Sequence, residues 1–111
     1  MAEPTGGIGL TKVARVQDIP QGQCKVVTVQ EKPIAVFNVQ GTFYAIYNKC
    51  PHEGGPLGEG RLKGHVVACP WHDLAFDIRS GAATDGGGYC VGSYQVVVKD
   101  DEVFVGAKRP R

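Results

Sequence analysis

Four side chains that can bind metals occur in this sequence as two short pairs. One residue separates Cys50 from His52, two separate Cys69 from His72, and residues 53–68 lie between the pairs. The members of each pair are close enough to reach one metal centre, and thiolates with imidazoles suit zinc and iron–sulfur groups. The intervening segment, EGGPLGEGRLKGHVVA, has five glycines and one proline, as expected of a loop that turns back and brings the pairs together. Glycine also lets backbone amides approach an inorganic group closely, because no Cβ blocks the way.

This set of side chains has three interpretations. One zinc ion could take all four in a tetrahedral structural site. The residues could instead be unligated core groups, although their paired spacing argues against chance. Two irons bridged by sulfide could also take one pair of side chains of each kind. Zinc is the less favoured metal for two reasons. Cys-x-His is an unusual zinc-binding spacing, and an all-β chain of this size has less need of a structural metal to stabilise its fold.

Strand signals dominate the remainder of the chain. Runs rich in β-branched residues predict strands, and Gln40-Gly41 and Asp100-Asp101 are two-residue connections typical of hairpins. No window has the apolar spacing of an amphipathic helix. Sixteen glycines and seven prolines punctuate these short runs, which is typical of an all-β barrel or sandwich with the Cys/His segment inserted between hairpins. The predicted strands are 10–16, 24–30, 33–39, 42–48, 94–99 and 102–106, with two shorter ones in HVVAC and DLAFD.

Length and composition indicate one ordinary globular domain over residues 1–111. Hydrophobic residues make up 42% and charged residues 21% of the chain, and a formal charge of +1 gives no strong field for nucleic acid or anionic lipid. No apolar run approaches the ~20 residues of a membrane span, and MAEPTGGIGL does not have the pattern of a signal peptide. We therefore expect a cytoplasmic protein with no membrane partner. Thiols stay reduced there, which favours metal binding over disulfides for the four cysteines.

The two pairs carry a specific resemblance. CPH at 50–52 and CPWH at 69–72 resemble the C-x-H and C-x-x-H boxes of Rieske [2Fe–2S] proteins. Upstream, FNVQGTFYAIYNKCPHEGGPLGEG resembles the family's strand, hairpin and first ligand loop. Further on, HVVACPWHDLAFDIRSG resembles the second ligand loop, and YQVVVKDDEVFV resembles the closing hairpin. The resemblance covers about residues 10–106.

The resemblance implies a fold and a ligand set. In this family two cysteines hold one iron and two histidines hold the other. Carried over, Cys50 and Cys69 bind the buried iron, and His52 and His72 bind the outer iron near the surface, with one cluster per chain. The family fold is an antiparallel β-sandwich or partial barrel base, here about 10–47 and 79–106, with a small cluster-binding lobe at about 48–78.

This sequence differs from respiratory Rieske proteins at several positions, and these differences indicate which branch of the family it resembles. Respiratory Rieske proteins link the two loops by a disulfide, and the matching positions here are Gly55 and Trp71, so that link cannot form. Their serine after the second box is replaced by Asp73-Leu74. Fewer hydrogen bonds to the cluster sulfurs favour a reduction potential at the low end of the Rieske range, about −150 mV.

A low-potential, unfused domain resembles the ferredoxins of bacterial aromatic-ring dioxygenase systems. Such a protein is a monomeric one-electron carrier, not an enzyme by itself, that passes electrons from a flavin-containing NAD(P)H reductase to a terminal oxygenase. The small subunit of assimilatory NAD(P)H nitrite reductase, which shares the fold, is the alternative within the family. A zinc-stabilised binding module is the alternative from another class.

Residues outside the boxes receive simpler expectations. His65 is expected at the surface and not as a ligand. Cys24 and Cys90 match no box position, and their default role is that of buried apolar thiols, with a disulfide between them left open. Trp71 is expected to pack over the cluster, with a place in a docking surface as the alternative. Three glycines at 86–88 predict a loose cover where the family has a cluster-shielding loop.

Overall fold

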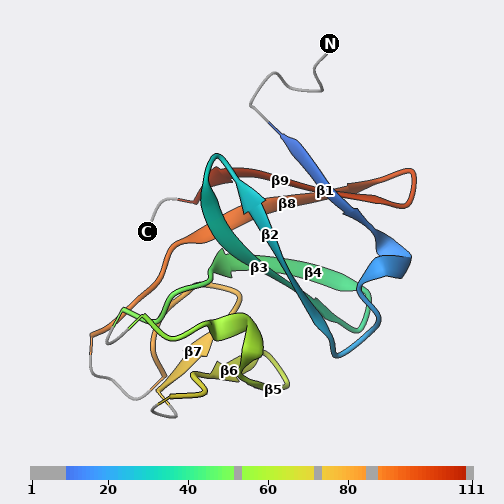
Figure 1. Ribbon diagram of the computed structural model, residues 1–111. Coiled ribbons are helices and arrows are strands. Elements are labelled where there is room, and N and C mark those ends of the chain that lie inside the picture. Colours follow the sequence, from blue (N-terminus) through green and yellow to red (C-terminus); the bar gives the residue numbers. More distant parts are fainter. Residues whose placement is uncertain (1–9, 52–53, 72–73, 85–87, 110–111) are drawn as a thin grey trace.

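The computed structural model describes residues 10–51, 54–71, 74–84 and 88–109, which consist mostly of strands (Figure 1). The strands are β1 (Thr11–Arg15), β2 (Cys24–Val29), β3 (Lys32–Val39), β4 (Thr42–Tyr47), β5 (Arg61–Lys63), β6 (Val66–Ala68), β7 (Ala75–Asp77), β8 (Ser93–Lys99) and β9 (Glu102–Lys108). Two single-turn 3-10 helices, η2 (Val16–Asp18) and η3 (Leu57–Glu59), complete the described elements. The all-β prediction is confirmed. None of the helices in these ranges has the length and apolarity needed to cross a membrane.

The larger sheet is antiparallel and nearly closed. Its six strands follow the order β1-β9-β8-β4-β3-β2, and the two end strands, β1 and β2, also contact each other. The apolar side chains on the inner face of this nearly closed sheet form the barrel core. Its buried members are Ala14, Ile19, Val29, Ile34, Val36, Phe43, Ala45, Val103 and Val105.

Strand β3 is buried on both faces. Ile34 and Val36 belong to the barrel core, whereas Ala35 and Phe37, which alternate with them, face a second cluster outside the barrel. Successive side chains of a strand point to opposite faces, so a strand covered on both sides becomes a continuous apolar run instead of an alternating one. The sequence PIAVFNV reflects this double coverage.

Three two-residue turns connect the strands of the barrel. The backbone φ angles are positive at both central residues in the turns at 30–31, 40–41 and 100–101. Positive φ at both positions is the signature of type I′ turns, which match the twist of hairpin strands. The turns at 40–41 and 100–101 follow the sequence prediction, and the turn at 30–31 joins two strands that had been predicted without a turn type.

A small lobe covers the outer face of β3 and β4. Its three strands pair in the order β5-β6-β7, and isolated bridges join Phe76 to Ala83 and Ala82 to Cys90. Figure 1 shows this lobe below the larger sheet. The predicted lobe boundary at residue 78 remains a prediction; the bridges extend the pairing of the small sheet as far as Cys90. The second cluster, here called the lobe core, contains Ala35, Phe37, Ile46, Cys50, Leu57, Val67, Cys69, Phe76, Ile78 and Val91.

Candidate metal centre

The two cysteines of the predicted boxes begin turns that close in the same way. The backbone N–H of Cys50 donates to the carbonyl oxygen of Gly55 at 2.8 Å, and that of Cys69 donates to the carbonyl oxygen of Leu74, also at 2.8 Å. Each bond therefore spans five residues. The first turn is tightened by a 2.7 Å bond from the N–H of Gly54 to the carbonyl oxygen of Cys50, and the positive φ of Gly54, 79°, favours glycine there.

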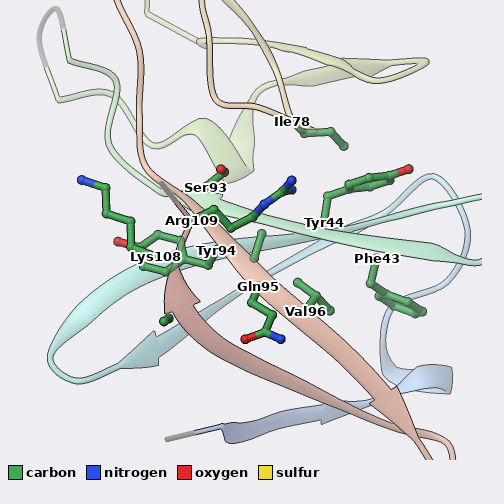
Figure 2. A pocket seen from close by; sticks show the side chains of 11 residues that line it. Phe43, Tyr44, Ile78, Ser93, Tyr94, Gln95, Val96, Lys108 and Arg109 are labelled. Carbon is green, nitrogen blue, oxygen red and sulfur yellow. The ribbon is translucent and has the colours of Figure 1, made fainter. Parts of the chain in front are cut away.

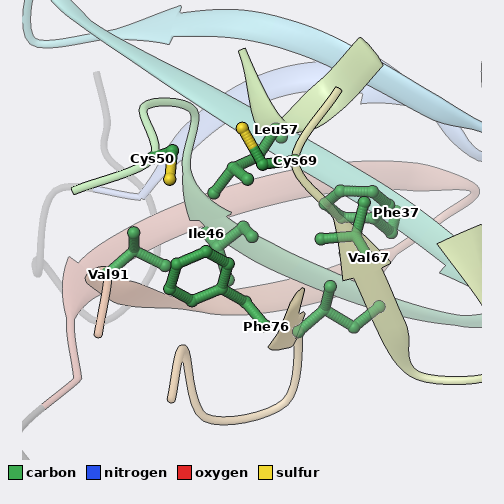
Figure 3. Close-up of a cluster of buried hydrophobic side chains, with 10 residues drawn as sticks. Phe37, Ile46, Cys50, Leu57, Val67, Cys69, Phe76 and Val91 are labelled. Atoms are coloured by element: carbon green, nitrogen blue, oxygen red, sulfur yellow. The ribbon is translucent and has the colours of Figure 1, made fainter. Parts of the chain in front are cut away.

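Both cysteines are buried in the lobe core. Their exposed fractions are 2% for Cys50 and 0% for Cys69, and they pack among aliphatic and aromatic side chains from both the barrel and the lobe (Figure 3). Cys50 follows β4, whereas Cys69 follows β6, so the lobe core brings together two segments far apart in sequence. The two predicted sulfur donors thus share one apolar environment.

Gly55 is the point at which the first turn meets the second. A Cβ at this position would lie 2.7 Å from Sγ of Cys69 and 3.1 Å from Cδ2 of Trp71. The absence of a side chain at Gly55 thus lets the Cys69 sulfur and the Trp71 ring lie directly against its backbone. The indole of Trp71 lies over this glycine but keeps an exposed fraction of 58%, so most of its surface faces outward. That exposure favours the docking alternative for Trp71 over complete shielding.

The predicted histidine ligands, His52 and His72, lie outside the described residues. Each falls inside one of the two closed turns in the sequence, His52 between Cys50 and Gly55 and His72 between Cys69 and Leu74. Among the described residues, which hold two of the four predicted ligands, no group of three or more Cys, His, Asp and Glu side chains gathers to hold a metal ion. The assignment of the histidines remains a prediction.

The donor set fits an iron–sulfur cluster. Two cysteine sulfurs from adjacent turns are sequestered from water, and thiolates are the common protein ligands of such clusters. The Cys69 sulfur can lie against the first turn because residue 55 is glycine. A bound [2Fe–2S] cluster would supply one-electron redox chemistry, and Cys50 and Cys69 are the described residues that would hold it.

The remaining cysteines and the third histidine lie apart from these turns. Cys24 and Cys90, both in the described part of the chain, form no disulfide; Cys24 is half-buried in β2 and Cys90 is exposed. Burial raises the pKa of the Cys24 thiol to about 12, which keeps the free thiol protonated at neutral pH. His65 is half-buried instead of fully exposed, and its ring packs edge-to-face on Tyr44 with centroids 5.5 Å apart. That contact joins the lobe to β4 and gives His65 a structural role that the sequence did not indicate.

The glycine-rich stretch at 84–90 is described only in part. The prediction of a loose cover concerned residues 86–88, of which 86 and 87 lie outside the described residues. Gly88 has a positive φ of 85°, and Tyr89, which follows it, is 40% exposed. The segment then returns to the lobe, where the N–H of Val91 donates to the carbonyl oxygen of Gly81 at 2.8 Å.

A groove of the described surface lies away from the cysteines. It has a volume of about 430 Å³ and runs along β4, β8 and the end of β9 (Figure 2). Tyr44 and Tyr94 contribute aromatic walls, and Lys108 and Arg109 also line it. Neither Cys50 nor Cys69, the two predicted ligands among the described residues, lines this groove.

Comparison with known proteins supports the same family along most of the chain. Residues 9–95 match the model of the Rieske [2Fe-2S] domain. The chain is 35% identical to ferredoxin CarAc of Metapseudomonas resinovorans over 100 residues, which cover 88% of this chain and 94% of that protein. It is also 34% identical over 98 residues to human apoptosis-inducing factor 3, where the match covers 87% of this chain and only 16% of the relative.

Solved structures show the same likeness. In a structure described as a complex of reduced oxygenase and oxidized ferredoxin in carbazole 1,9a-dioxygenase, one chain matches with a TM-score of 0.86 and 32% identity, covering 95% of this chain and all of that one. A putative small subunit of nitrite reductase matches with a TM-score of 0.79 and 21% identity over 88% of this chain and 98% of that one, a likeness of the fold alone. The matched cysteine turns, the two-part fold and these similarities agree, and the chain belongs to the Rieske [2Fe-2S] domain family, whose cofactor is a [2Fe–2S] cluster.

Proposed function

We propose that this protein is a one-electron carrier that passes electrons from a flavin-containing NAD(P)H reductase to a terminal oxygenase. Cys50 and Cys69 bind one iron of its cluster, and His52 and His72 bind the other. The observation that carries the proposal is the pair of equivalently closed cysteine turns, whose cysteines are buried in one core and which meet where the side chains of Cys69 and Trp71 lie against Gly55.

The comparisons support a carrier instead of a catalyst. The match covers 94% of ferredoxin CarAc but only 16% of human apoptosis-inducing factor 3, and several further relatives are ferredoxin components of dioxygenase systems. In the structure that it resembles, a ferredoxin is bound to an oxygenase. Four protein ligands and bridging sulfides complete both irons, which leaves no open position for a substrate. A monomer in the cytoplasm, where thiols stay reduced, goes with this proposal.

Iron analysis of the purified protein tests the cofactor. A red-brown protein with two irons and two acid-labile sulfides per chain is expected. A colourless protein that contains zinc would exclude the carrier role and favour the structural zinc site.

Electron transfer is tested next, with the loaded protein. A flavin reductase of a ring-hydroxylating dioxygenase system should reduce it with NAD(P)H, and the matching oxygenase should reoxidise it. Transfer to a sirohaem nitrite reductase, without transfer to the oxygenase, would assign the protein to the nitrite branch.

Two histidine variants test the ligand assignment. His52→Ala and His72→Ala should each lose the visible absorption of the cluster, because one iron loses a ligand. Either variant with an intact visible spectrum would exclude that histidine as a ligand.

A further inference from the structure

A buried asparagine stands where β4 leads into the first cysteine turn. Asn48 follows the last residue of β4, precedes Cys50 by two residues, and is 8% exposed. Its backbone N–H donates to the carbonyl oxygen of Pro33 at 2.9 Å, which fixes it to β3. Its side-chain Oδ1 accepts the backbone N–H of Gly58 at 2.6 Å. Asn48 therefore holds one element of the barrel and one of the lobe at the same time.

The Asn48–Gly58 hydrogen bond closes a ten-residue segment that contains the whole first turn. Gly58 lies in η3, beyond Gly55, and its neighbour Leu57 is completely buried in the lobe core. A Cβ at Gly58 would lie 2.6 Å from Cγ2 of Val26 on β2, so η3 is seated directly on the barrel. The side chain of Asn48 thus ties the far end of the turn to the strand from which the turn departs.

We propose that Asn48 is a positioning residue that keeps the first cysteine turn closed around the cluster. This inference rests on the proposed ligand roles of Cys50 and His52, and Asn48 itself binds no metal. Loss of its acceptor oxygen leaves the partly buried N–H of Gly58 without that partner, and opening of the turn to water would remove this cost. Local opening of this segment then becomes more frequent, although the barrel stays folded.

Release of iron to a chelator measures this opening. In the loaded protein, Asn48→Ala should lose its visible absorption to excess ferrous and ferric chelators about tenfold faster than the wild type at a temperature well below unfolding. Asn48→Asp keeps an oxygen that can accept the N–H of Gly58, so its rate should stay within about threefold of the wild type. The visible circular dichroism of the bound cluster should change in Asn48→Ala and be largely restored in Asn48→Asp.

Asn38 provides a matched control. It is also a buried asparagine, 6% exposed, and its side chain makes two hydrogen bonds. Nδ2 donates to the carbonyl oxygen of Ile19 at 2.7 Å, and Oδ1 accepts the N–H of Gly41 at 2.9 Å, so both bonds lie within the barrel. Asn38→Ala should therefore lower the urea midpoint of unfolding but release iron at the wild-type rate.

Two results would overturn the inference. One is an Asn48→Ala protein that releases iron at the wild-type rate; the other is an Asn38→Ala protein that releases iron as fast as Asn48→Ala, since overall stability alone would then explain both. If Asn48→Ala does not fold, Asn48→Ser, whose shorter side chain cannot reach Gly58, replaces it in the same comparison. A wild-type protein that never binds iron would refute the proposed function instead.

Discussion

Replacement of Gly60 by alanine tests how closely the lobe is assembled. Gly60 joins η3 to β5, and a Cβ there would overlap the backbone carbonyl oxygen of Ala68 and lie 3.2 Å from the carbonyl oxygen of Leu57. Ala68 pairs with Arg61 across β5 and β6 and precedes Cys69 in the chain. Both obstacles are backbone atoms, so no side-chain rotation can make room, and the pairing of β5 with β6 must shift.

The cost is the balance of two effects. Overpacking that displaces backbone costs about 1–3 kcal/mol, and the upper half of that range applies because the obstacle is a carbonyl group. Alanine can adopt the φ of Gly60, −80°, and its smaller loss of backbone entropy on folding returns about 0.4–1 kcal/mol. We expect a net loss of about 1–2.5 kcal/mol. With a urea m value of about 1–1.5 kcal/mol/M for a small domain, the midpoint should fall by about 1–2 M.

Urea unfolding followed by far-UV circular dichroism measures this shift, and Gly92→Ala is its control. A Cβ at Gly92 would lie 3.0 Å from Cε of the exposed Lys108 side chain, which can move aside, and at an ordinary contact distance of 3.6 Å from Cε1 of Tyr94. The control should stay within about 0.5 kcal/mol of the wild type. A Gly60→Ala protein that unfolds at the same urea concentration as the control would refute the steric reasoning.

Three further substitutions test other parts of the structure. Asp77→Asn removes a carboxyl whose pKa is held below its ordinary value chiefly by hydrogen bonds from Arg79, so unfolding free energy at pH 7 should fall by up to about 1 kcal/mol. Because a depressed folded-state pKa gives stability that is full above the ordinary value and is lost as the pH falls through the lower folded-state value, this difference from the wild type should shrink progressively below about pH 4; a constant difference from pH 7 to pH 3 would contradict it. Glu31→Gly relieves a φ of 68° and should raise the free energy of unfolding by about 0.5–1 kcal/mol in urea titrations, whereas a loss of stability would argue against strain at that turn. His65→Ala should cost about 0.5–1.5 kcal/mol through its lost ring contact and leave the visible spectrum of the loaded protein intact; a bleached variant would make His65 a ligand.

The barrel strands could be predicted because each carries its own local signal. The run PIAVFNV and the connection at 40–41 indicate a hairpin without reference to any distant residue, and β3 and β4 occur where expected. Strand β5 was missed because Arg61–Lys63 is only three residues long and two of them are charged and exposed. These residues form a strand because they pair with β6, and the short segment itself carries no sequence signal for that pairing. Helix η3 is likewise produced by burial of Leu57 in the lobe core and by the hydrogen bond from Gly58 to Asn48.

The spacing of the Cys/His pairs predicts a ligand set, but it could not predict the contacts around the cysteines. Two such pairs with a glycine-rich spacer are enough for that prediction, since ligand type and spacing are local properties, and the assignment of the ligands stays a prediction. That Gly55 lies against Cys69, or that Asn48 reaches Gly58, depends on how the first turn lies across the second. An asparagine two residues before a cysteine can have many roles in a protein. The role of Asn48 is recognised only from its burial and its hydrogen bond in the folded structure.

The described part of the site is positioned by backbone bonds, and this suits electron transfer. The backbone N–H of each cysteine is bonded five residues ahead, so each Cα is fixed before any metal binds. Both sulfurs then point into a core shared by the barrel and the lobe, where close packing limits rotamer change. A centre whose ligands cannot move far reorganises little when its charge changes by one. The rigidity of the turns therefore follows from the same contacts that fold the lobe, and substitutions such as Gly60→Ala should weaken both together.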